Sequence, residues 1–143
     1  MTNAGGHSSI PEQDNAIYHL AAGLVRLADF NFPVRLDDIT RVYFERSAEI
    51  AGGPIGAAMN GVAARPPDPE AIARLALVPH YNAMMRTTCV ATMLAAGHAE
   101  NALPQTALAT VNCRLLPDDS PDAVRSTLAE LLGDEAILSL IHI

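Results

Sequence analysis

The chain has 143 residues, half of them hydrophobic, with 4% aromatic residues and no Trp. That length suits one domain with a core of Ala, Leu, Val, Ile and Met. The net charge is −7, and the nine basic residues, all Arg, form no cluster, so neither nucleic acid nor a membrane surface is a predicted partner. The sequence contains no apolar run of roughly 20 residues and no signal-peptide pattern, and localisation stays unknown because a longer parent protein can be exported.

The first segments predict a short strand and a helix. Residues 5–9, Gly-Gly-His-Ser-Ser, have extended or turn character. Asp14 is expected to cap a helix that ends before residues 30–33. The apolar residues of this helix recur at helical spacing and are Ile17, Leu20, Ala21, Leu24, Leu27 and Ala28.

Residues 35–80 predict a helical insertion. Asp37 or Asp38 provides the N-cap of its first helix, which the Gly-Gly-Pro sequence at 52–54 ends. Another helix begins after Asp68, because Pro follows at the first helical position. The Pro-containing segment that carries His80 is interpreted as a connector.

Residues 86–94 and 105–116 predict two antiparallel strands joined by a polar loop. Alternation in the second strand places one set of residues toward a core: Ala107, Ala109, Val111, Cys113 and Leu115. The other set lies on an open face: Thr106, Leu108, Thr110, Asn112 and Arg114. A regular register pairs Cys89 with Cys113, Ala91 with Val111 and Met93 with Ala109, all expected on the core side.

The pairing leaves two interpretations of the only two cysteines. Cys89 and Cys113 form a cross-strand disulfide in an oxidising compartment, or they are two small buried hydrophobic residues. We favour the buried thiols, and the sequence does not decide between the two.

The predicted fold class is α+β, a ferredoxin-like βαββαβ antiparallel sheet with two helices on one face, interrupted by the insertion. A helix starts after Ser120 and ends at Gly133, and a last strand follows at about 136–141. The first strand is expected to be truncated. Residues 138–143 match a translated sequencing-transposon end, so we expect a non-native read-through tail there and a single domain at residues 1–137.

Three polar residues are candidates for a site, although each has an ordinary interpretation. His7 sits in a Gly-Gly-His-Ser-Ser segment that is equally a turn, Asn101 is equally a loop cap, and Arg114 is equally a surface residue of an open sheet. His98-x-Glu100 lacks a second His at helical spacing, so no metal site is predicted in this chain.

Two stretches together resemble a known family. GGHSSIPEQDNAI at 5–17 and NAMMRTTCVATMLAAGHAENALPQTALATVNCRLLPDDS at 82–120 are similar to the dimerisation (lid) domain of the zinc metallopeptidases of family M-twenty. That family includes carboxypeptidase, aminoacylase and succinyl-diaminopimelate desuccinylase relatives. The resemblance covers about residues 3–137, and the long helical insertion resembles the larger carboxypeptidase-like members.

The resemblance implies a role for each candidate residue. His7 resembles the lid histidine that reaches into the partner subunit's active site and stabilises an oxyanion. Asn101 resembles a substrate-binding asparagine, and Arg114 resembles the arginine that holds the substrate carboxylate. The chain is thus expected to form a homodimer through this domain.

The parent reaction implied is hydrolysis of a peptide or N-acyl amide bond next to a free carboxylate, in a peptide or N-acyl amino acid. Its cofactor is a pair of zinc ions held in a catalytic domain whose motifs this chain lacks, so the fragment alone is expected to bind no zinc and to be inactive. The alternative is a free-standing ferredoxin-like dimeric module that binds or senses a small molecule without catalysis.

Overall fold

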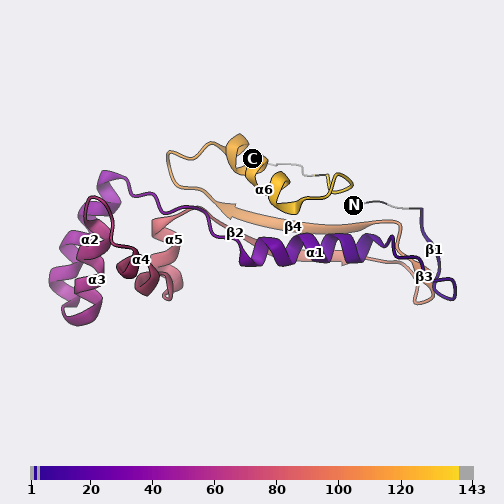
Figure 1. The fold of residues 1–143 in the computed structure, drawn as a ribbon, viewed down its shortest axis with the longest axis horizontal. Coiled ribbons are helices and arrows are strands. Elements are labelled where there is room, and N and C mark those ends of the chain that lie inside the picture. Colours follow the sequence, from indigo (N-terminus) through magenta and orange to yellow (C-terminus); the bar gives the residue numbers. More distant parts are fainter. Residues whose placement is uncertain (1, 3, 139–143) are drawn as a thin grey trace. The chain divides into compact units, whose positions relative to one another are not determined.

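The computed structural model describes residues 2 and 4–138 and shows a mixed α+β chain with six helices and two small antiparallel sheets (Figure 1). Its elements in chain order are β1 (Gly6–His7), α1 (Ala16–Asp29), α2 (Asp38–Ala51), α3 (Gly53–Ala63), α4 (Pro69–Ala76), α5 (Pro79–Met85), β2 (Thr88–Ala96), β3 (Ala102–Leu103), β4 (Ala107–Arg114) and α6 (Pro121–Leu132).

The chain divides into two compact units. The sheet unit comprises the described residues of Met1–Asn31 and Cys89–Ile143, and the helical unit comprises Phe32–Thr88. The helical unit is the predicted insertion, and it is wider than the expected range of 35–80. Among the described residues, no helix is both long enough and apolar enough to cross a membrane.

The sheet unit contains two two-stranded sheets in its described part, β1 with β3 and β2 with β4, where the sequence predicted one four-stranded sheet. The strand expected at 136–141 is not formed at residues 136–138, and residues 139–141 lie outside the described residues. The backbone there is committed to a turn, because the Ile137 N–H donates to the Asp134 carbonyl at 3.0 Å and the Ala136 N–H donates to the Asp134 carboxylate at 2.9 Å.

Helix α1 packs its buried face, which includes Leu20, against Ala107 of β4. Its N-cap is Asn15, whose side chain accepts a 2.8 Å hydrogen bond from the Ile17 N–H, and not the expected Asp14. The predicted apolar face was partly wrong. Leu20 and Leu27 are buried and Leu24 is half-buried, whereas Ile17, Ala21 and Ala28 are exposed.

The two faces of β4 confirm the predicted alternation. Ala107, Ala109, Val111 and Cys113 are buried or half-buried, and Leu108, Thr110, Asn112 and Arg114 are exposed. Strand β2 does not follow the prediction, because Ala91 is exposed and Met93 is 68% exposed. Helix α1 packs against β4. Leu94 of β2, whose side chain points to the opposite face of the strand from Met93, is also exposed.

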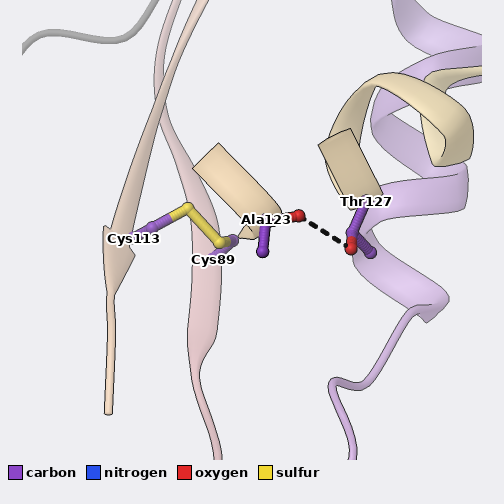
Figure 2. The surroundings of a disulfide bond; sticks show 4 residues. All are labelled: Cys89, Cys113, Ala123 and Thr127. Carbon is purple, nitrogen blue, oxygen red and sulfur yellow. Dashed lines mark hydrogen bonds between the residues drawn. A yellow bond between two sulfur atoms is a disulfide. The ribbon is translucent and has the colours of Figure 1, made fainter. Parts of the chain in front are cut away.

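Cys89 and Cys113 form a disulfide, so the favoured interpretation as two free buried thiols was wrong. Their Cα atoms lie 4.1 Å apart, in the register that the sequence predicted. The hydroxyl of Thr92 donates a 3.3 Å hydrogen bond to the Thr110 carbonyl in the same register. Figure 2 draws the disulfide with part of α6, where the Thr127 hydroxyl donates to the Ala123 carbonyl at 3.1 Å.

The helical unit has a core of its own, built from small and apolar side chains of α2 to α5 around Phe44, Met59 and Leu75. Asp37 and Asp68 cap α2 and α4 as predicted, each by accepting a backbone N–H. The segment interpreted as a connector is the helix α5, which begins with Pro79 at its first position.

The two ends of the helical unit are tied together. The Arg35 N–H donates to the Met85 carbonyl at 2.9 Å, and the Arg86 guanidinium donates to the Phe32 carbonyl at 3.0 Å. Burial lowers the pKa of Arg86. Residues near the two ends of this unit are thus hydrogen-bonded to each other, so the chain enters and leaves the unit at one place. The unit can therefore be inserted without interrupting the packing of α1 on β4.

Candidate functional site at the paired ends of strands β1 and β3

Strands β1 and β3 bring two of the three predicted site residues together. In this antiparallel pair, His7 lies opposite Ala102 and Gly6 lies opposite Leu103. One residue further along, the Ser8 N–H donates a 3.0 Å hydrogen bond to the carbonyl of Asn101. The His7 and Asn101 side chains are both exposed, so a ligand or a neighbouring chain can reach them.

The two glycines before His7 allow this close pairing. Gly5 has φ +75°, and a Cβ atom there would lie 2.7 Å from Cγ of Gln105. A Cβ atom at Gly6 would lie 3.0 Å from the Leu103 side chain. The amide of Gln105 also donates to the Ala4 carbonyl at 3.1 Å. The positive φ of Gly5 and the close approach of the Gln105 and Leu103 side chains to this backbone therefore account for the Gly-Gly sequence before His7.

The segment after β1 is a tight turn, as the ordinary interpretation of the motif predicted. The Ile10 N–H donates to the His7 carbonyl at 3.0 Å, which closes the turn. Inside it, Nδ1 of His7 lies 2.7 Å from the Ser9 hydroxyl oxygen and 3.2 Å from the Ser9 backbone nitrogen. The imidazole is thus held through one nitrogen, and no described residue bonds to the other, Nε2.

Arg114 lies elsewhere in the sheet unit. It is the last residue of β4, on the exposed face that also carries Asn112. Seven residue steps separate Ala107 from Arg114, which is about 23 Å at the usual rise of a strand. In Figure 1 the arrowhead marks the C-terminal end of β4, and β1 and β3 lie past its N-terminal end. One chain therefore cannot bring Arg114 and His7 to the same small ligand.

No described residues gather into a metal site, since no group of three or more His, Cys, Asp or Glu could hold an ion there. The described residues therefore do not fit a zinc centre, which needs three or four such ligands. The two carboxyl groups with a lowered pKa lie outside the site. Hydrogen bonding to Thr40 lowers the pKa of Asp37, and a hydrogen bond from His19, then one from the Ala136 N–H, lowers that of Asp134.

Sequence reasoning did not assign Ser9 to the site. Its position two residues after His7, within a Gly-Gly-His-Ser-Ser turn, was the available signal, because Ser side chains in such turns bond to groups two residues away.

These features define an α+β domain that presents polar residues at exposed positions and whose described residues form no metal centre. A sequence profile of the peptidase dimerisation domain matches residues 1–138, and the chain belongs to this family, whose members carry a typically metal-dependent catalytic domain elsewhere. A dimerisation domain of this family implies self-association of the protein that carries it.

Two curated relatives are peptidase-like or act on acylated amino acids. A probable carboxypeptidase S-like protein of Dictyostelium discoideum is 28% identical over 137 residues, covering 96% of this chain and 26% of the relative. An N-fatty-acyl-amino acid synthase/hydrolase of Xenopus tropicalis is 32% identical over 139 residues, covering 96% of this chain and 27% of the relative. The chain thus spans about a quarter of these relatives. No solved structure matches it.

Proposed function

We propose that this chain is the dimerisation domain of a longer zinc-dependent hydrolase, which cleaves a peptide or N-acyl amide bond next to a free carboxylate. The names of the two relatives, a carboxypeptidase-like protein and a hydrolase of N-fatty-acyl amino acids, support this substrate class. The metal belongs to the remainder of the longer protein. The chain's own contribution is to bind and orient the substrate and to stabilise charge on it.

In this proposal His7 acts in trans, in the active site of the partner protomer. Its Nε2–H donates to the carbonyl oxygen of the scissile bond as negative charge builds there. Asn101, whose backbone carbonyl accepts a hydrogen bond from the Ser8 N–H, contacts the same substrate. Arg114 of the other protomer holds the free carboxylate with its planar guanidinium fork.

The observation that carries the proposal is the separation of Arg114 from His7 and Asn101 along β4. If all three residues serve one substrate, they have to come from two chains. Their exposure agrees with a site that is complete only after association.

The surface next to β4 is suited to a two-fold dimer. Strand β2 pairs only with β4 among the described residues, and its Met93 is 68% exposed. Tyr18 and Val25 of α1 are 66% and 61% exposed. A second copy that extends the sheet across β2 buries these apolar side chains and the free edge. We further propose that the assembled sheet is ferredoxin-like.

Complementation between inactive variants of the longer enzyme tests the proposal. His7→Ala and Arg114→Ala homodimers are each expected to lose most activity. In a random mixture of the two, half the dimers are hybrids with one intact site of two, so about a quarter of wild-type activity returns. Recovery with an intact dimer supports action in trans.

The matched control mixes His7→Ala with Asn101→Ala. Because these two residues lie on the same protomer, every hybrid site carries a lesion and no activity returns. Recovery in this mixture, or none in the first, contradicts the proposed arrangement. No metal-dependent hydrolysis of dipeptides or N-acyl amino acids by the wild type favours the non-catalytic binding module instead.

A further inference from the structure

We infer that Ser9 is a positioning residue for His7, which it holds in the tautomer that carries its proton on Nε2. This inference rests on the proposed function of His7 as the donor to the developing oxyanion. It assigns a role to a side chain that contacts no substrate in that proposal.

The argument begins with the two contacts at Nδ1. A backbone N–H can only donate, so the 3.2 Å contact from the Ser9 nitrogen makes Nδ1 an acceptor. The Ser9 hydroxyl, with its oxygen 2.7 Å from Nδ1, then donates as well, and the two donors share one lone pair. A proton on Nδ1 would point against the Ser9 N–H, and the neutral ring therefore carries its proton on Nε2.

The same contacts fix the direction of the ring. The turn is closed by the hydrogen bond from the Ile10 N–H to the His7 carbonyl, so Ser9 is held at a set position relative to the imidazole. With Nδ1 turned inward to Ser9, Nε2 points away from the turn, and no described residue bonds to it. An oxyanion donor needs this arrangement, because its N–H has to be aimed before charge develops.

Ser8 supplies a matched control. It neighbours Ser9 in the same turn, but its recorded hydrogen bond uses the backbone N–H, which donates to the Asn101 carbonyl. Ser8→Ala therefore keeps the pairing of β1 with β3, whereas Ser9→Ala removes a hydroxyl from the imidazole. Ser9→Thr keeps the hydroxyl and is the conservative variant.

The first measurement is nitrogen NMR of the His7 ring in the 143-residue chain, at a pH where the ring is neutral, with the signals assigned by comparison with His7→Ala. We expect Nδ1 to be unprotonated and Nε2 to be protonated in wild type and in Ser8→Ala. In Ser9→Ala the two shifts should move toward each other, and Ser9→Thr should restore them. A protonated Nδ1 in wild type, or no change in Ser9→Ala, overturns the inference.

The second measurement is a double-mutant cycle in the longer enzyme. Ser9→Ala should lower kcat about two- to tenfold, the worth of one hydrogen bond, with KM little changed. In a His7→Ala background the same substitution should have no further effect, since Ser9 acts through His7. If Ser9→Ala lowers kcat by the same factor in the His7→Ala background as in wild type, the inference is overturned. Full activity of His7→Ala would remove the proposed function of His7, and the NMR result would still decide the tautomer.

Discussion

Nδ1 of His19 on α1 lies 2.5 Å from a carboxylate oxygen of Asp134, directly after the end of α6. The other ring nitrogen lies 3.2 Å from the Asp14 carboxylate. Seven residues along α1, the Arg26 guanidinium donates to the Leu131 carbonyl at 2.9 Å and also to that of Leu132. Helix α1 thus satisfies carbonyls at the α6 C-terminus that have no partner within the helix.

The first prediction concerns acid stability. The pKa of Asp134 is lowered in the folded chain, so its ionised form stabilises the fold above its ordinary pKa, and this contribution is lost as the pH falls through the lowered value. Asp134→Asn should therefore lower the free energy of unfolding at pH 7. The difference in free energy of unfolding between wild type and Asp134→Asn should disappear as the pH falls below about 4.

Urea unfolding at a series of pH values measures this difference. Asp14→Asn is the control, because the Asp14 side chain is 66% exposed against 20% for Asp134, and its effect should be smaller. An Asp134→Asn effect that does not depend on pH would show that the loss is one of packing and not of charge.

The second prediction concerns the close contact of α2 and α3. A Cβ atom at Gly56 would lie 2.5 Å from the backbone oxygen of Ala48, which cannot rotate away. Gly56→Ala gains about 1 kcal/mol of helix propensity but forces the two helices apart, so we expect a net loss of about 1–3 kcal/mol. Asn60→Ala, at an exposed position of α3, should stay within about 0.5 kcal/mol of wild type.

Comparing the stability of the two α3 variants by urea unfolding checks this prediction. Equal stability of Gly56→Ala and wild type would mean that α2 and α3 can separate without loss of the core around Phe44.

The third prediction concerns the disulfide. Cys89 and Cys113 are 24 residues apart, and closing a loop of that size stabilises a fold by about 3.5 kcal/mol in the chain-entropy description. Reduction of the wild type should lower the free energy of unfolding by about this amount, and a Cys89→Ala/Cys113→Ala variant should show no response to reductant. Denaturant unfolding with and without reductant makes the comparison. Wild-type stability that reductant leaves unchanged would contradict the predicted contribution.

The fourth prediction concerns the proposed dimer. Val25→Arg places a charge on the exposed apolar side of α1 and should raise the dimer dissociation constant at least about tenfold, because a buried unpaired charge is costly. Ile50→Arg, on the 90% exposed Ile50 of the helical unit, is the control and should leave association unchanged. Sedimentation equilibrium measures both. A Val25→Arg dimer as tight as wild type would exclude this face of α1 as the interface.

The fifth prediction concerns Arg114 in the longer enzyme. Arg114→Lys keeps the charge but loses the bidentate fork, so KM should rise about tenfold while kcat changes little. Arg125→Lys on α6, which pairs with Asp122 at 3.6 Å, is the control and should leave both constants unchanged. A fall in kcat at constant KM would move Arg114 from substrate binding to the chemical step.

The local features of this fold could be predicted from sequence. The alternation of β4, the caps Asp37 and Asp68, and the end of α6 at Gly133 each depend on a few neighbouring residues. Asn15 and Asp14 are equally good caps, and their order in the sequence does not choose between them. Pro79 stands at the first position of α5, where proline is typical of a helix start, and the interpretation of this segment as a connector overlooked it.

Long-range packing could not be predicted in the same way. The exposure of Met93 depends on which element covers β2, and an apolar side chain does not reveal that. The pairing of His7 with Ala102 joins segments far apart in the chain, and neither the local pattern nor the family resemblance predicted it. The choice between thiols and a disulfide depends on how closely two strands approach, which composition does not record.

The alternation of β4 assigns two different tasks to one short segment. Its inward residues, from Ala107 to Cys113, maintain the fold, and its outward residues, among them Asn112 and Arg114, are free to serve a ligand. Selection can therefore act on the two sets independently. In a family whose substrates diversify, the outward positions can drift with the substrate while the inward positions stay small, so neighbouring residues in this strand are expected to evolve at different rates.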